Sequence, residues 1–103
     1  MQRFYGMLGF AMRAGKLVIG TELVCRAMAK GTVRLAVYSA YASPATKKKI
    51  TVKCEFYNIP AIEVDIDTER LGKQLGKSYA PAVVGVCDDG FAEEIRKAAV
   101  HRD

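Results

Sequence analysis

Apolar residues recur three and four positions apart in five segments of the chain, and this spacing predicts five helices. Residues at the ends of these segments also favour helices. Gly20-Thr21-Glu22 can cap the free amides of one helix and complement its dipole, and Ser43-Pro44 is a strong start for another. In the second helix we expect Leu23, Ala27 and Met28 to face the core. The five segments are roughly residues 4–14, 20–30, 43–57, 69–76 and 88–99.

Four shorter apolar runs between these helices predict strands. The run at 82–87 is nearly all apolar, which is typical of a central strand. Residues 61–67 alternate strictly, so Ile62, Val64 and Ile66 share one face and three carboxylates the other. That pattern indicates a half-buried strand near a sheet edge. The four segments are residues 17–19, 33–38, 61–67 and 82–87.

The regular alternation of helix and strand predicts an α/β fold. We expect a three-layer α-β-α sandwich with a four-stranded mixed sheet and five helices. The chain has 103 residues, enough for one closed core and too few for two. We therefore expect residues 1–103 to form a single domain.

Composition narrows the class of protein further. Half of the residues (50%) are hydrophobic and 26% are charged, which favours a soluble globular protein over a disordered chain. No apolar run approaches the roughly 20 residues that span a bilayer, and the first residues lead into a patterned helix instead of a signal peptide. We expect a cytoplasmic protein without a membrane contact. Cys25, Cys54 and Cys87 form no CxxC pair, so we expect buried, reduced thiols.

Charge is distributed unevenly along the chain. Ten lysines and arginines face one acid, Glu22, up to Cys54, whereas six basic residues face ten acidic ones in the remainder. If these halves separate in space, one side of the molecule is positive and attracts polyanions such as nucleic acid. A soluble surface with unequal charge remains the plainer interpretation.

Signs of catalysis are mostly missing. Gly15 and Gly20 flank a strand without GxGxxG or P-loop spacing, and a triad would need His101, which we place in a solvated tail. The acids at 65–67 and 88–89 are explained by an edge strand and a helix cap. We therefore expect no enzyme, no cofactor and no metal site. A small phosphate-handling enzyme at the Gly20 helix start remains a minor alternative.

Several residues qualify for binding a nucleic acid. The helix start at Gly20 offers backbone amides to a phosphate, and Arg26 can reach the same ligand. Tyr41 and Tyr79 lie in predicted loops, where they can stack on an unpaired base. Each also has a plain interpretation, because Arg26 and the Lys47–Lys49 run suit a solvated helix face and either tyrosine can close the core.

Two segments resemble the L7Ae and L30e type ribosomal proteins, which bind kink-turn RNA. The first runs from Leu8 to Lys16 and continues at Gly20–Arg26, and the second is Leu71-Gly72-Lys73-Gln74-Leu75-Gly76, similar to the family's LGKxxG segment. The resemblance covers nearly all of residues 4–99 and is closest to a bacterial branch of short ribosomal-protein-like members.

This resemblance implies that the start of the second helix, the loop after the second strand and the loop before the last strand embrace a bent duplex. This chain differs from the family at Glu22-Leu23, where the family commonly has Asn-Glu or Lys-Gln that read tandem G·A pairs. Leu23 cannot make that hydrogen bond. The RNA-binding residues that we expect are Lys16, Gly20, Thr21, Glu22, Arg26, Tyr41, Lys77, Ser78 and Tyr79.

We therefore expect a non-catalytic protein that binds structured RNA, ribosomal or otherwise linked to translation, with the ribosome or translation proteins as further partners. The alternative is a protein-interaction module that kept this fold with a degenerate RNA site. Protein partners that are still captured in a pull-down after nuclease treatment would favour this alternative.

Overall fold

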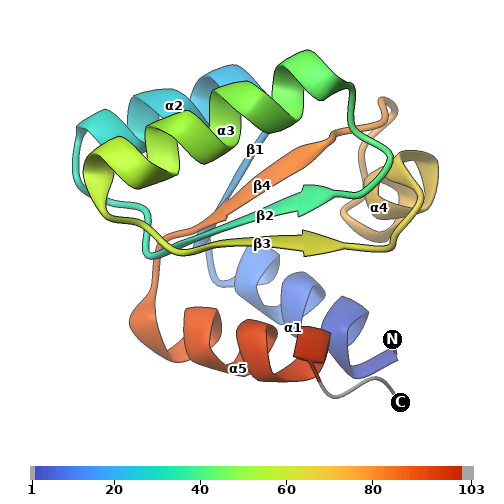
Figure 1. Cartoon of the computed structure of the whole chain (residues 1–103). Helices are drawn as coiled ribbons and strands as arrows, with labels where there is room; N and C mark the ends of the chain where they lie inside the picture. The colour runs from blue at the N-terminus through green and yellow to red at the C-terminus, as the bar shows by residue number, and fades with distance from the viewer. Residues whose placement is uncertain (1, 101–103) are drawn as a thin grey trace.

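A four-stranded mixed sheet lies at the centre of the protein, whose computed structural model describes residues 2–100. The strands are β1 (Leu17–Ile19), β2 (Leu35–Ser39), β3 (Ala61–Val64) and β4 (Val83–Val86). They lie in the order β1-β4-β2-β3 (Figure 1). β2 and β3 are parallel, and β4 is antiparallel to both of its neighbours. The buried strand β4 is central and β3 is at an edge, as the sequence predicted.

Helices cover both faces of this sheet. They are α1 (Gln2–Arg13), α2 (Thr21–Ala29), α3 (Pro44–Tyr57), α4 (Thr68–Gln74) and α5 (Asp89–Val100). Helices α2 and α3 pack on one face, α1 and α5 on the other, and α4 lies beside one end of the sheet (Figure 1). The predicted three-layer sandwich with five helices is therefore confirmed. Within residues 2–100, no helix is both long and apolar enough to span a bilayer.

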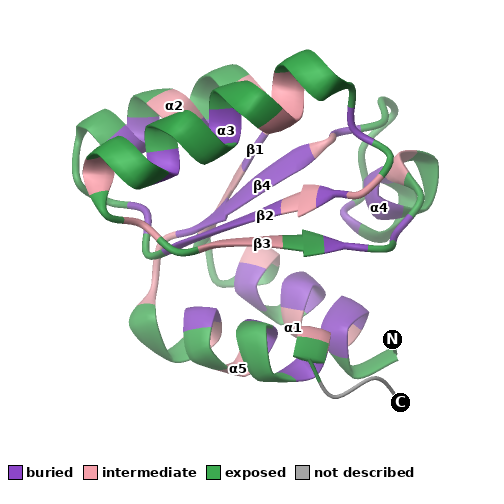
Figure 2. Ribbon diagram, in the orientation of Figure 1, coloured by how far each residue is buried: buried purple, intermediate pink, exposed green. Residues whose placement is uncertain are grey.

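Two apolar clusters hold the layers together, one on each face of the sheet. Because side chains alternate along a strand, β4 contributes to both: Val84 and Val86 pack toward α1 and α5, and Val83 toward α2 and α3. Figure 2 shows the burial concentrated on the strands and on the inward sides of the helices. Fully buried members of the two clusters include Phe4, Leu8, Leu35, Ile95, Val24 and Ile50.

Local capping fixes several helix starts. The Ser43 hydroxyl accepts a hydrogen bond from the Thr46 amide at 3.2 Å. The carboxylates of Asp67 and Asp88 accept the amides two and three residues ahead, each at 2.9 Å. Capping therefore accounts for these two acids, and within residues 2–100 no group of three or more His, Cys, Asp or Glu could hold a metal ion. His101 lies outside the described residues.

Two predicted strand boundaries were wrong. The third strand ends at Val64 instead of residue 67, because Asp67 leaves the strand to cap α4. The second strand runs from Leu35 to Ser39 instead of 33–38. Ser39 therefore belongs to the sheet and not to the following loop, which proves important for the site.

The predicted inward face of α2 was also partly wrong. Leu23 is 52% exposed, and Val24 is fully buried in its place. One residue along a helix turns a side chain by roughly 100°, so the two cannot share a face. The three cysteines are free thiols, as predicted. Cys54 is buried, but Cys25 and Cys87 are only half-buried.

The two halves of the chain do not separate into a positive and a negative face. Helix α1, from the basic half, packs beside α5, from the acidic half. Arg3 and Glu94 form an ion pair across this contact at 3.4 Å. Any positive surface must therefore arise from the fold instead of the charge of each half.

Candidate RNA-binding surface

One end of the sheet joins four segments that are far apart in the chain, and we call this end the rim. Strands β1, β2 and β3 finish there and β4 begins there. The Gly20 amide donates to the Val83 carbonyl at 2.9 Å. The Ser39 amide donates to the Ala82 carbonyl, also at 2.9 Å. The rim comprises the start of α2 and three loops, residues 40–43, 65–67 and 75–82.

The start of α2 offers backbone N–H groups at the rim. Its N-cap, Gly20, has a φ of 107°, a conformation that residues with a side chain rarely adopt. No side chain caps α2, whereas Ser43 and Asp67 cap α3 and α4. The N–H groups of the first turn have no partner within the helix, and the helix dipole adds positive charge. This helix start is suited to bind a phosphate.

Glu22 lies among three cationic side chains of α2 and α3. Its carboxylate accepts a hydrogen bond from Lys49, which connects the two helices. This hydrogen bond and the charge of Lys49 lower the pKa of Glu22, with smaller contributions from Arg26 and Lys53. The same contact raises the pKa of Lys49. Three cations around one carboxylate give this part of the surface a net positive charge at neutral pH.

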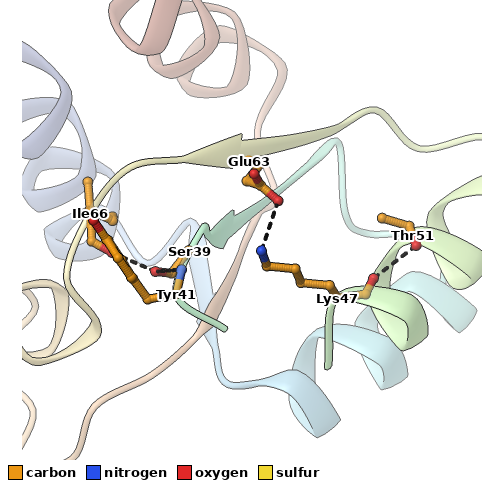
Figure 3. Close-up of polar contacts among 6 residues, drawn as sticks. All are labelled: Ser39, Tyr41, Lys47, Thr51, Glu63 and Ile66. Carbon is orange, nitrogen blue, oxygen red and sulfur yellow. Dashed lines mark hydrogen bonds and ion pairs between the residues drawn. The ribbon is translucent and has the colours of Figure 1, made fainter. Parts of the chain in front are cut away.

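The lysine run of α3 serves different roles. Lys47 forms an ion pair with Glu63 of β3 at 3.4 Å, and Lys49 pairs with Glu22 (Figure 3 shows the first pair). Lys48 is exposed to solvent. The plain interpretation, a solvated helix face, therefore fits Lys48, whereas Lys47 and Lys49 connect α3 to other elements of the fold.

A buried hydroxyl holds the loop after β2 (Figure 3). Ser39 is fully buried, and its Oγ donates to the Ile66 carbonyl at 2.5 Å and accepts the Tyr41 amide at 3.0 Å. The loops after β2 and β3 are thereby tied together. The Tyr41 side chain remains 68% exposed, as predicted for a loop residue.

Tyr41 borders an acidic hollow at the rim. Tyr41, Asp65 and Asp67 line a space of about 460 Å³. Hydrogen bonding to Asp65, and then the charge of that carboxylate, raise the pKa of Tyr41. Two carboxylates repel a phosphate, while the phenol ring can stack on a base. This part of the rim therefore suits a base and not the backbone of a nucleic acid.

The loop before β4 carries a second exposed aromatic residue. Tyr79 is 53% exposed and its neighbours Lys77 and Ser78 are exposed as well. Residues of this loop and of α4 line a hollow of about 380 Å³. Its lining residues are Glu69, Lys73, Lys77, Ser78, Tyr79 and Ala80. Two of them are lysines, so cation and aromatic ring lie together here.

Most of the predicted RNA-binding residues lie at the rim. The rim contains Gly20, Thr21, Glu22, Tyr41, Lys77, Ser78 and Tyr79. Arg26 lies one turn beyond Glu22 on the same helix and is exposed.

Lys16 is not brought to the rim. It precedes β1, and its carbonyl accepts the Cys87 amide at 2.8 Å at the opposite end of the sheet. Lys16 is close to Gly20 in the sequence, but β1 lies between them and takes the chain from one end of the sheet to the other.

Sequence reasoning missed two residues that shape the rim. Ser39 was placed in a loop, although a lone hydroxyl after four mostly apolar residues is a signal for a buried hydrogen bond. Gly72 was noted only within the LGKxxG segment, yet it lies buried where α4 meets the loop before β4. A glycine inside a predicted helix was the available signal.

Comparisons with known proteins agree over nearly the whole chain. Residues 2–96 match the profile of the ribosomal protein L7Ae/L30e/S12e/Gadd45 family. The chain is 37% identical over 92 residues to the RNA-binding protein YlxQ of Bacillus subtilis (strain 168), covering 89% of this chain and 90% of that protein.

Solved structures give the same result. A protein of unknown function from Bacillus halodurans C is 35% identical and superposes with a TM-score of 0.87, covering 96% of this chain and 98% of that one. The Giardia lamblia 15.5kD RNA binding protein shares the fold, with a TM-score of 0.78 at 14% identity over 93% of this chain and 81% of that one. The present chain belongs to the ribosomal protein L7Ae/L30e/S12e/Gadd45 family.

Proposed function

We propose that this protein binds structured RNA at the rim, without catalysis, as a component of cytoplasmic ribosomal or other translation-linked ribonucleoprotein. The observation that carries the proposal is the convergence of different RNA-binding groups at one end of the sheet. The uncapped start of α2 suits a phosphate, and the exposed rings of Tyr41 and Tyr79 suit unpaired bases. Arg26 adds a cation on the adjoining surface of α2.

Relatives support this proposal. The Bacillus subtilis relative is named as an RNA-binding protein, and the family is one of ribosomal proteins. Of the segments that carried the resemblance in the sequence, Gly20–Arg26 and residues 71–76 border the rim, whereas Leu8–Lys16 lies in α1 and the loop before β1.

Kink-turn RNA is the finer form of the proposal. The start of α2, the loop after β2 and the loop before β4 lie at one end of the sheet, which supports this form of the proposal. Leu23 is exposed where the family commonly reads a G·A pair, so we expect contacts to phosphates and extruded bases to supply more of the affinity. Glu22 retains a carboxylate acceptor at the neighbouring position.

Binding to a matched pair of RNAs tests both levels of the proposal. One is a kink-turn duplex with tandem G·A pairs, and the other is the same duplex without its bulge. We expect the binding constant to fall steeply with salt: the slope of its logarithm against the logarithm of salt concentration should steepen by about 0.7 to 0.9 for each phosphate contact. Preference for the bulged RNA supports kink-turn recognition, and equal binding limits the function to structured RNA. Absent or salt-insensitive binding to both RNAs and to ribosomal RNA contradicts the proposal.

Exposure of Leu23 also favours the second candidate, a protein-interaction module with a degenerate RNA site. Affinity capture from lysate with and without nuclease distinguishes the two. Partners that survive nuclease and depend on Leu23 favour the module, whereas partners lost after nuclease favour RNA binding.

A further inference from the structure

The loop before β4 passes directly over a glycine of α4. A Cβ atom added at Gly72 would lie 2.2 Å from the Tyr79 carbonyl oxygen, 3.3 Å from the Tyr79 carbonyl carbon and 3.1 Å from Cδ of Pro81. The first distance is far below any normal contact, and the atom concerned belongs to the backbone. Any residue with a side chain at position 72 must therefore displace the main chain at Tyr79.

A hydrogen bond also holds the same loop to Gly72. The Lys77 amide donates to the Gly72 carbonyl at 2.8 Å. The chain reverses at Gly76, just before Lys77, where φ is 68°. The loop thus leaves α4, turns, and returns across the helix at Gly72. Its main chain is fixed on the helix, while the Tyr79 ring remains 53% exposed.

Helix stability does not explain this glycine. Glycine inside a helix is less favourable than alanine, because it orders more backbone freedom and contributes no side chain. In α1, Gly6 shows the contrast: a Cβ there would meet nothing within 4 Å. Gly72 is instead required by the close approach of the loop.

We infer that Gly72 is a positioning residue for RNA binding, which sets the place of Tyr79 at the rim. The inference rests on the proposed function, since Tyr79 must contact the RNA for its position to matter. Gly72 itself is buried. It acts by letting the loop lie against α4, which fixes the main chain that carries the exposed Tyr79 ring.

A double-mutant cycle on the full chain tests this inference, with the kink-turn duplex described above as the probe. Gly72→Ala and Tyr79→Ala should each weaken binding by about fivefold or more, the lower range for loss of one base stack. The double variant should bind no more weakly than Tyr79→Ala, because the ring whose position is disturbed is already absent. The control, Gly6→Ala, should bind as the wild type does, and thermal melting confirms that each variant is folded.

The outcomes separate the inference from the proposed function. Wild-type protein that binds none of the RNAs contradicts the proposed function and the inference together. Wild-type binding that is unchanged in folded Gly72→Ala, or losses that simply add in the double variant, overturn the inference alone. If Gly72→Ala does not fold, Gly76→Ala takes its place, because a side chain at this positive-φ turn disturbs the same loop. Losses of RNA affinity that add in the variant carrying Gly76→Ala and Tyr79→Ala then overturn the inference.

Discussion

The two ends of the sheet differ in which helix termini they present. Helices α2 and α3 both begin at the rim, so their N–H groups and positive dipole ends are directed there. At the opposite end the same helices finish, beside a hollow of about 310 Å³ lined by Met28, Tyr57 and Pro60 among others. Helix α5 begins at this far end, but the Asp88 carboxylate caps it, so the uncapped start of α2 makes the rim the end better suited to an anion.

Polar side chains reinforce this difference. At the far end Arg34 pairs with Asp89 at 3.5 Å and donates to the Gly31 carbonyl at 3.4 Å, so its charge is used within the protein. At the rim Tyr41 and Tyr79 are exposed, and Arg26 is exposed on α2. We therefore expect one end of the sheet to bind RNA and the other to serve the fold, and the following variants test that division.

The largest expected effect is on stability, at Ser39. Ser39→Ala leaves the Ile66 carbonyl and the Tyr41 amide without their buried partner, which costs about 2 kcal/mol of unfolding free energy. Thr32→Ala is the far-end counterpart; it removes a partly buried bond to the Ala27 carbonyl and should cost less than about 1 kcal/mol. Urea denaturation measures both. Equal losses would mean that the hydroxyl of Ser39 has no special part in the rim.

Charge reversal at the two ends should affect RNA binding unequally. Arg26→Glu removes a cation near the start of α2 and should weaken binding at low salt by about tenfold or more, with a shallower dependence on salt. Lys16→Glu makes the same charge change at the far end and should alter affinity less than about twofold, through long-range charge alone. Titration by fluorescence anisotropy at two salt concentrations provides the measurement. A similar loss in both variants would contradict a localised site.

Two exposed aromatic residues make a smaller comparison. Tyr79→Ala at the rim should weaken RNA binding by about fivefold, the effect of losing one stacked base. Phe56 is 76% exposed in the last turn of α3, toward the far end, and Phe56→Ala should leave affinity unchanged. The same titration compares them. Weaker binding by the Phe56 variant would extend the RNA contact along α3.

The smallest expected effect is the acid sensitivity of the link between α2 and α3. The pKa of Glu22 lies below its ordinary value of 4.5 in the folded protein, because of Lys49. The pair therefore contributes stability above pH 4.5 and loses that contribution as falling pH protonates the carboxylate. Unfolding by urea at neutral pH and at about pH 3 should show a slightly larger loss for wild type than for Glu22→Gln. A loss of the same size in both would exclude this ion pair as a source of acid sensitivity.

Local sequence patterns predicted the fold well because their causes are local. Helical spacing, the Ser43-Pro44 start and the apolar run of β4 depend on neighbouring residues, and the structure confirms them. The inward face of α2 was less predictable. Both Leu23 and Val24 are apolar, and only the seating of the helix on the sheet selects Val24 as the buried one.

The candidate site was predicted in part for the same reason. A helix start at Gly20 and exposed loops at Tyr41 and Tyr79 follow from nearby residues. Which of these lie together depends on strand direction, which local patterns do not give; the grouping was predicted from the family resemblance alone. Lys16 is four positions from Gly20, yet a strand separates them by roughly 13 Å at about 3.3 Å per residue.

The elements of this protein, their order, the caps at Ser43 and Asp88 and the exposed loops were predictable from local sequence, because they follow from interactions between residues close in the chain. The three-dimensional fold brings the α2 start and the loops before β4 and after β2 together as one rim. It also decided that Ser39 and Gly72 hold those loops in place. Both outcomes depend on contacts between segments far apart in sequence, such as the 2.9 Å bond from Gly20 to Val83, which no local pattern encodes.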